Sequence, residues 1–313
     1  MNYEKLKEHL RDVAFTTTAP FSEDGSDVLY VEAARNTEAV FEAGGRCFIP
    51  CGNTGEYYSL NDEERLRLVK TTVEVVGDEG VVIAGIAGST KEVIEQTRAY
   101  KEAGADGVMV HAPDHTYVHS RGIVKYYERL ADATDIGIVM YKRGPSLSLS
   151  AVSELSTIEN VVGLKYAVND IAAFSKMVRE VPGELIFSTG IAERFAPAFA
   201  LEGAEGFTTG IGSFAPEVSL ALQEALEAED WERALELRDL TRPYEDLREE
   251  SGANNEFEAA NNVPAIKHGL ELAGLYGGPV REPLVELSEE DKRRAETYYE
   301  QLADAEFATP VQN

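Results

Sequence analysis

The sequence has few cysteines, few basic residues and no long hydrophobic run. Cys47 and Cys51 are the only two cysteines among 313 residues. They are too few and too close in sequence for a disulfide framework, so buried, reduced thiols are expected. No apolar stretch approaches the roughly 18 residues that a membrane-spanning helix needs, and the first residues lack a basic segment followed by an apolar one. A soluble, cytoplasmic protein is therefore expected.

Positive charge is scarce, because 29 Lys and Arg stand against 56 Asp and Glu and give a formal net charge of −27. Such a charge repels the phosphates of nucleic acids and anionic membrane surfaces, and so argues against both as partners. The acidic residues are spread over helical segments and not gathered in a tail. Dispersed acid with few lysines is typical of adaptation to high salt, which screens self-repulsion. A halophilic protein is expected, with an ordinary acidic enzyme as the alternative.

Short apolar runs alternate with amphipathic segments over most of the chain, which is the pattern of buried parallel strands followed by helices. The eight candidate strands are Val13–Thr17, Cys47–Ile49, Val81–Gly85, Gly107–Val110, Gly137–Tyr141, Val161–Lys165, Leu185–Thr189 and Gly206–Thr209. Eight such units in order predict an α/β fold, a (β/α)8 TIM barrel. A doubly wound open sheet is the second candidate, but no Gly-x-Gly-x-x-Gly follows the first strand.

The strand signal stops after residue 228, and three further helical patterns follow at 230–248, 255–273 and 288–303. We therefore expect a barrel over 1–228, a C-terminal helical extension over 229–303 and a frayed tail over 304–313. Helices appended to a barrel most often pack on it or make subunit contacts. No separate domain is needed to explain them.

The apolar run at 161–165 is the most informative stretch, because it ends in Lys165. A lysine at the end of a buried strand has its stem in the core and its amine at the rim. Partial desolvation there favours the free amine, the form that attacks a ketone. Lys165 is therefore the candidate Schiff-base nucleophile. The alternative is a lysine whose amine only reaches solvent at a strand end.

The active site of a barrel of this kind lies at the C-terminal ends of its strands, and two of these ends carry further polar groups. Asn53, Thr54 and Gly55 follow the second strand in a loop whose backbone N–H groups suit a carboxylate, unless it is a plain turn. Tyr141 ends the fifth strand, and its phenol can relay protons; a nearby cation would lower the pKa of that phenol. The alternative is a tyrosine whose hydroxyl only makes a structural hydrogen bond. Arg143 can pair with a substrate anion or lie free on the surface.

Three histidines, His111, His115 and His119, follow the fourth strand at helical spacing, which suggests a metal site. Pro113 argues against the helix that would align them, so no metal is expected. A single histidine that contacts substrate hydroxyls is favoured, and His115 is the candidate. The last two strands end in small, polar segments that suit a polyhydroxy substrate. The candidate contacts there are Gly190, Thr208 and Thr209.

Taken in order, these motifs resemble the dihydrodipicolinate synthase / N-acetylneuraminate lyase family of class I aldolases, over nearly the whole chain. The likeness rests on Gly-Asn-Thr-Gly-Glu at 52–56, Tyr141, Val-Gly-Leu-Lys at 162–165, Gly-Phe-Thr-Thr at 206–209, and Val-Pro-Ala-Ile-Lys at 263–267. The resemblance implies a barrel with C-terminal helices, usually a homotetramer. It also implies that Lys165 forms the Schiff base, Tyr141 moves protons, and Thr54 with its neighbours holds the carboxylate of an α-keto acid.

The sequence departs from dihydrodipicolinate synthases in three places. Asn53 replaces the first of two threonines in their loop, and His115 stands where they place a tyrosine from a neighbouring subunit in the proton relay. Their arginine for a second substrate carboxylate is not reproduced at Ser146-Leu147-Ser148. The loop looks more like the sugar-acid dehydratase branch of the family, which includes 5-dehydro-4-deoxyglucarate and 2-keto-3-deoxy-pentonate dehydratases.

The resemblance thus implies a cofactor-free hydro-lyase that converts a 2-keto-3-deoxy-pentonate, derived from xylonate or arabinonate, to 2,5-dioxopentanoate. One alternative is decarboxylating dehydration of 5-dehydro-4-deoxyglucarate, for which Arg143 would bind the second carboxylate. Another is retro-aldol cleavage to pyruvate and an aldehyde. A sugar-acid-binding paralogue without turnover is the alternative outside enzymes, and the joint presence of Lys165 and Tyr141 argues against it.

Overall fold

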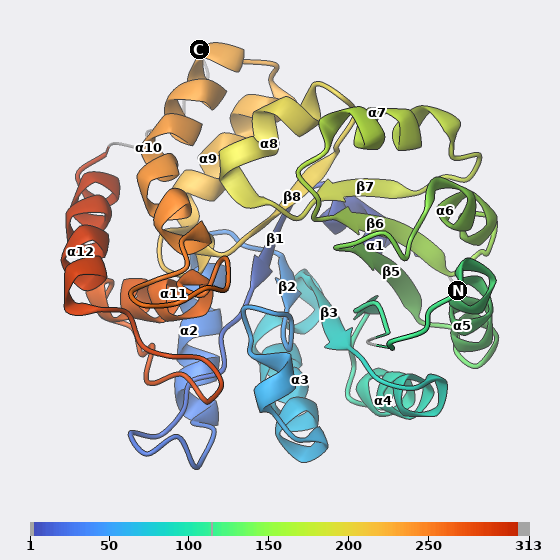
Figure 1. Ribbon diagram of the computed structural model, residues 1–313, viewed down its shortest axis with the longest axis horizontal. Coiled ribbons are helices and arrows are strands. Elements are labelled where there is room, and N and C mark those ends of the chain that lie inside the picture. The colour runs from blue at the N-terminus through green and yellow to red at the C-terminus, as the bar shows by residue number, and fades with distance from the viewer. Residues whose placement is uncertain (1–2, 114, 306–313) are drawn as a thin grey trace.

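The computed structural model describes residues 3–113 and 115–305, and its centre is a closed ring of parallel strands (Figure 1). Each strand pairs with its neighbours in chain order, and β8 closes the ring onto β1. The strands are β1 (Val13–Thr16), β2 (Cys47–Ile49), β3 (Val81–Ile86), β4 (Gly107–Val110), β5 (Gly137–Lys142), β6 (Val161–Tyr166), β7 (Ile186–Thr189) and β8 (Gly206–Thr209). The predicted (β/α)8 TIM barrel is confirmed, and the ring excludes the open sheet.

The predicted strands agree with the observed ones because both faces of a barrel strand are covered. Every residue of β6 is buried, for example, so the strand appears in the sequence as a continuous apolar run. Inward-facing side chains fill the ring, and Val139, Val162 and Ile186 belong to this inner cluster. The barrel interior is therefore a packed core. The space for a ligand lies above it, where the strands end.

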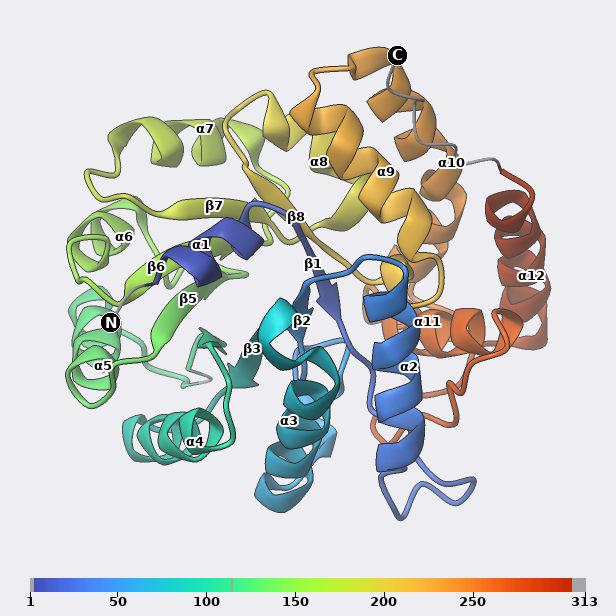
Figure 2. The same cartoon turned by 180° about the vertical axis from the view of Figure 1, so that it is seen from behind.

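Helices cover the outside of the ring (Figure 1). The eight that follow the eight strands in turn are α2 (Tyr30–Glu42), α3 (Asp62–Val76), α4 (Thr90–Glu102), α5 (Ser120–Asp132), α6 (Leu149–Leu155), α7 (Ile171–Glu180), α8 (Ala192–Ala200) and α9 (Pro216–Glu227). Capping residues start several of them; Asn61 and Ser89 each form a capping box, with Glu64 and Glu92. The first helix, α1 (Glu4–Leu10), lies across the end of the ring that is opposite to the C-terminal ends of the strands (Figure 2). Its Leu6 and Leu10 pack against the inner cluster there.

Three helices follow the barrel and gather on one side of it, α10 (Trp231–Glu249), α11 (Asn262–Leu272) and α12 (Glu289–Ala303) (Figure 1). Helix α10 packs on α8 and α9, and its Leu237 and Tyr244 share a core cluster with Phe15 of β1. We propose that the extension folds with the barrel as one unit. Of the tail predicted at 304–313, residues 306–313 lie outside the described residues.

The helix predicted over 255–273 begins later than expected, at Asn262. The side-chain amide of Asn255 donates to the carbonyl groups of Ser251 and Phe257, and this local bonding competes with helix formation. The two cysteines are buried and unpaired, as expected. In the part of the chain that is described, no helix has the length and apolar character needed to cross a membrane.

Candidate active site

The C-terminal ends of the strands surround a cavity of about 430 Å³. Eight of the ten predicted site residues line it, although they come from five different strand ends. They are Asn53, Thr54, Tyr141, Arg143, Lys165, Gly190, Thr208 and Thr209. Parallel strands in one ring bring their carboxyl ends to the same rim, so residues far apart in sequence meet here.

Lys165 lies in the wall of this cavity with only 7% of its surface exposed. Its neighbour across the sheet is Tyr141, and its Nζ lies 4.9 Å from the centre of the Tyr141 ring. Gly190 leaves room for the lysine stem, because a Cβ at that position would lie 2.8 Å from the Lys165 Cε. Burial, helped by the positive charges of Arg143 and Arg248, lowers the pKa of Lys165 to about 7. A large fraction of the amine is therefore free near neutral pH, as attack on a ketone requires.

The Tyr141 hydroxyl accepts a hydrogen bond from Asn53 Nδ2 at 3.0 Å. Because that bond uses a lone pair of the oxygen, the phenolic proton stays available for a ligand in the cavity. Burial raises the pKa of Tyr141, and this effect outweighs the opposing charge of Arg143. The predicted effect of a nearby cation is present, since Arg143 lowers the Tyr141 pKa, but burial makes the net shift upward. The phenol is protonated at neutral pH and can act first as an acid.

The histidine beside the site is His111, whereas the sequence had favoured His115. The His111 ring is buried, stacks on Tyr57 with centroids 5.4 Å apart, and meets the Tyr141 ring edge-on at 5.3 Å. Burial, with the charges of Lys165 and Arg143, lowers the pKa of His111 to about 3, so the ring is neutral. The signal in the sequence was its position directly after a strand.

His115 lies on the exposed loop after β4, and its Nδ1 accepts a hydrogen bond from the Tyr117 backbone at 3.0 Å. It does not line the cavity of its own chain. His119 caps α5 by accepting from the Arg121 backbone. Across the described residues, no three His, Cys, Asp or Glu side chains cluster in a way that could hold a metal ion.

Gly55 is the other predicted residue that does not line the cavity. A Cβ there would lie 2.8 Å from the Thr17 carbonyl oxygen, so the residue lets the loop pack closely against the backbone after β1. The loop itself is closed by hydrogen bonds from the Glu56 and Tyr57 backbone to the carbonyl groups of Asn53 and Gly52. Binding of a carboxylate by Asn53 and Thr54 stays a prediction.

The sequence did not reveal the buried ion pair that holds this loop in place. Glu56 Oε1 lies 2.6 Å from Lys267 Nζ of α11, and both side chains are almost fully buried. Lys267 also donates to the Pro279 carbonyl at 2.6 Å, and the second Glu56 oxygen accepts from the Arg281 backbone at 3.0 Å. The C-terminal extension thereby fixes the loop that carries Asn53.

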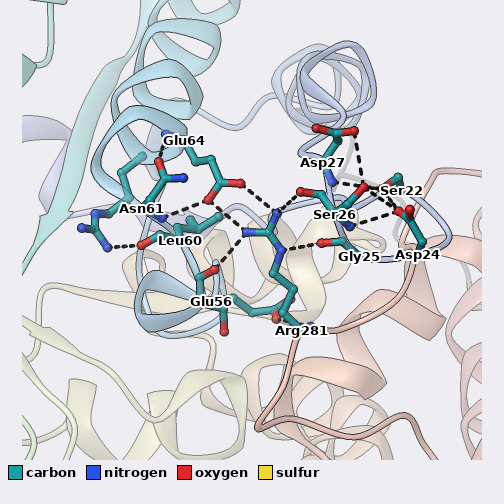
Figure 3. Close-up of polar contacts among 12 residues, drawn as sticks. Ser22, Asp24, Gly25, Ser26, Asp27, Glu56, Leu60, Asn61, Glu64 and Arg281 are labelled. Atoms are coloured by element: carbon teal, nitrogen blue, oxygen red, sulfur yellow. Dashed lines mark hydrogen bonds and ion pairs between the residues drawn. The ribbon is translucent and has the colours of Figure 1, made fainter.

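Arg281 adds a second connection between the extension and the same region (Figure 3). Its guanidinium donates to both carboxylate oxygens of Glu64, at 2.8 and 2.9 Å. It also donates to the carbonyl groups of Gly25, Ser26 and Ser59. One side chain thus ties the loop after β1, the short η1 helix (Tyr57–Ser59) and the first turn of α3 together.

Replacing Lys267 with methionine is expected to lower the free energy of unfolding by about 3–5 kcal/mol, because it leaves the buried Glu56 carboxylate without a partner. The double variant with Glu56→Gln removes that charge and should recover most of the loss. Lys292→Met is the matched control, since its ion pair with Glu289 is exposed and should change stability by less than about 1 kcal/mol. Denaturant unfolding measures all three. A Lys267→Met protein as stable as Lys292→Met would contradict the proposed role of the pair.

A buried lysine with a partly free amine, beside a protonated tyrosine at the mouth of a (β/α)8 barrel, is the arrangement of a lysine-dependent class I aldolase-type lyase. Residues 9–302 match the Dihydrodipicolinate synthetase family, and the chain belongs to this family. The family predicted from the sequence is thus confirmed, and the protein is an enzyme, a lyase of the class I aldolase type.

Relatives with two different names resemble the chain. A 4-hydroxy-tetrahydrodipicolinate synthase of Methanoculleus marisnigri is 33% identical over 86% of this chain and 91% of its own length. A probable 5-dehydro-4-deoxyglucarate dehydratase of Streptomyces avermitilis is 30% identical over 85% of this chain and 84% of its own. The crystal structure of dihydrodipicolinate synthase from Oceanobacillus iheyensis superposes with a TM-score of 0.91 at 33% identity, covering 97% of this chain and all of that one.

Proposed function

We propose that the enzyme is a hydro-lyase that converts a 2-keto-3-deoxy-pentonate to 2,5-dioxopentanoate through an imine on Lys165. The observation that carries the proposal is the buried Lys165 amine next to the protonated Tyr141 phenol in one cavity. Asn53 supports the dehydratase branch over the synthases, because it replaces the first threonine of the synthase loop and donates to Tyr141. The relatives named as dehydratases are compatible with this assignment.

The first half of the reaction forms the imine. The substrate carboxylate lies on the loop of Asn53 and Thr54, and the free amine of Lys165 attacks the C2 ketone. Loss of the carbonyl oxygen as water gives a protonated imine, which withdraws electrons from C3. Burial of Lys165 favours this step because it keeps the amine deprotonated before attack.

The second half removes the C4 hydroxyl. A proton leaves C3 for the Tyr141 oxygen, the resulting enamine expels the C4 hydroxyl, and the proton that Tyr141 gives up leaves with that hydroxyl as water. Tautomerisation then removes a proton from C5 and adds one at C3, which gives a C4–C5 enol, and transfer of the enol hydroxyl proton to C4 produces the C5 aldehyde. Hydrolysis of the imine frees Lys165 and 2,5-dioxopentanoate. The substrate loses one molecule of water overall, and no oxidant or reductant is consumed.

Decarboxylating dehydration of 5-dehydro-4-deoxyglucarate is the second candidate, favoured by the names of three relatives and by the exposed Arg143 at the cavity. Its substrate has a carboxylate at both ends, and Arg143 would bind the second one. Retro-aldol cleavage would use the same imine. The products distinguish the three reactions.

The test is incubation with 2-keto-3-deoxy-pentonates, a 2-keto-3-deoxy-hexonate and 5-dehydro-4-deoxyglucarate at high salt, with every product identified. We expect 2,5-dioxopentanoate from a pentonate, with neither pyruvate nor carbon dioxide. Pyruvate would indicate retro-aldol cleavage. Carbon dioxide, with the glucarate derivative as the best substrate, would establish the second candidate.

We also propose a homo-oligomer, with a homotetramer as the expected state. The loop after β4 that carries His115 exposes Tyr117 over 86% of its surface, together with Val118. Adjacent exposed apolar side chains of this kind are typical of contact surfaces. In such an assembly His115 would be placed to contact the substrate of a neighbouring subunit, and this role stays a prediction.

A further inference from the structure

Arg248, which the sequence analysis did not single out, brings a guanidinium from the last turn of α10 into the wall of the cavity. The side chain is only 5% exposed. Its Nη1 pairs with Glu245 one turn earlier, and its Nη2 donates to Asn262 Oδ1 at 3.2 Å. Its Nε has no hydrogen-bond partner among the described residues. That Nε is itself buried, but Nη1 and Nη2 each carry a second N–H besides the one used, so this guanidinium at the cavity wall is suited to a ligand that accepts hydrogen bonds.

The end of β8 is shaped to receive this guanidinium. A Cβ at Gly210 would lie 2.4 Å from Arg248 Nη2, so any larger residue would displace the arginine. Gly210 directly follows Thr208 and Thr209, two of the predicted substrate contacts on the cavity wall. The Arg248 charge also acts on Lys165, which places it within electrostatic reach of the reacting amine.

Arg248 is already paired with a buried acid. Glu245 is buried beside it, and burial raises the pKa of Glu245 to about 7 against the opposing effect of the Arg248 charge. Two more acids, Glu249 and Glu258, line the same cavity from exposed positions. A carboxylate at this end would meet the negative groups Glu249 and Glu258 and an arginine that already pairs with Glu245, whereas neutral hydroxyl groups can accept hydrogen bonds from Arg248.

We propose that Arg248 is a specificity-determining residue that donates hydrogen bonds to the uncharged, hydroxyl-bearing end of the sugar acid, and that Glu249 and Glu258 disfavour a second carboxylate there. The inference rests on the proposed function, because it assumes that the keto end of the substrate is bound at Lys165. It goes beyond that function by selecting monocarboxylate over dicarboxylate substrates. Arg143 approaches the cavity from β5, which is not a neighbour of β8 in the ring.

The first test uses Arg248→Met and Arg248→Lys with two ligands. Pyruvate has the keto acid but no hydroxyl-bearing end, so borohydride trapping of pyruvate reports on Lys165 alone. The trapping is done at pH 9, where the Lys165 amine is largely free and loss of the Arg248 charge has little effect on it. The pyruvate concentration that gives half-maximal trapping should then change less than about threefold. The KM for the 2-keto-3-deoxy-pentonate should rise about tenfold or more in Arg248→Met, and less in Arg248→Lys.

Equal losses for pyruvate and pentonate, or no loss for either, would overturn the role of Arg248. A wild-type protein that traps neither ligand would instead refute the proposed function.

The second test keeps the core intact and replaces Glu249 and Glu258 with glutamine. The kcat/KM for 5-dehydro-4-deoxyglucarate relative to the pentonate should then rise several-fold at low salt and less at high salt. Glu256→Gln, outside the cavity, is the control, and an unchanged ratio in the double variant would refute the exclusion.

Discussion

Replacing Lys165 with methionine is expected to abolish turnover and, at the same time, to stabilise the fold. Methionine has a side chain of similar length but no amine, so no imine can form with the ketone. We expect kcat/KM to fall by roughly 10⁴-fold or more, as for other nucleophiles whose loss removes the reaction path. Lys176→Met, on the exposed face of α7, is the control and should retain full activity.

The gain in stability follows from the buried amine. The pKa of Lys165 is about 7 in the fold and near its ordinary value of 10.5 in the unfolded chain. Between pH 7 and 10.5 the unfolded chain binds a proton that the folded protein lacks, so the free energy of unfolding of the wild type rises with pH over this window. At pH 7 the methionine variant avoids this cost and should be more stable by roughly 2–4 kcal/mol.

Denaturant unfolding of the wild type and of Lys165→Met at pH 7 and pH 9.5 measures this effect. The stability difference should shrink as the pH rises, because removing the proton that the unfolded chain holds costs less free energy the closer the pH is to 10.5. A variant that is less stable than the wild type at pH 7, or a difference that does not depend on pH, would contradict the burial of an uncharged amine.

Replacing Tyr141 with phenylalanine is expected to lower kcat by about 10²- to 10⁴-fold while the imine at Lys165 still forms. The ring and its edge-on contact with His111 remain, and only the hydroxyl that accepts from Asn53 is lost. In the proposed reaction the phenol protonates the leaving C4 hydroxyl, so its loss should slow elimination more than attack on the ketone.

Steady-state turnover and borohydride trapping, measured on the same preparation, separate the two steps. Tyr126→Phe is the matched control, because its hydroxyl donates to the Gly88 carbonyl at 3.1 Å and does not line the cavity. It should keep its kcat within about twofold of the wild type. If Tyr141→Phe turns over as fast as Tyr126→Phe, another group supplies the proton.

The sequence predicts the barrel and the positions of Lys165 and Tyr141 because both follow from local patterns. Each strand is a short apolar run, and Lys165 and Tyr141 are polar residues at the ends of two such runs. Neighbouring parallel strands bring their ends to one rim, and the observed register sets these two residues side by side. The local sequence pattern and the parallel order of the strands are therefore enough to predict that Lys165 and Tyr141 lie together.

The remaining parts of the site depend on tertiary packing. Arg248 ends a helix whose pattern predicts only an outer amphipathic segment, and its entry into the cavity depends on Gly210, distant in sequence. The pairing of Glu56 with Lys267 likewise joins two distant segments. His111 and His115 both follow β4, and the aromatic rings that bury the first of them cannot be read from local spacing. The Tyr141 pKa is raised by burial, which also depends on tertiary packing and not on local spacing.

The most direct test of the account is reduction of the enzyme with borohydride during turnover of a 2-keto-3-deoxy-pentonate, followed by peptide mass spectrometry. We predict a single adduct, on the peptide that contains Lys165, and none in the Lys165→Met protein. An adduct on another lysine, such as the half-buried Lys142 next to Tyr141, or turnover without any adduct, would contradict the imine at Lys165 on which the proposed reaction depends.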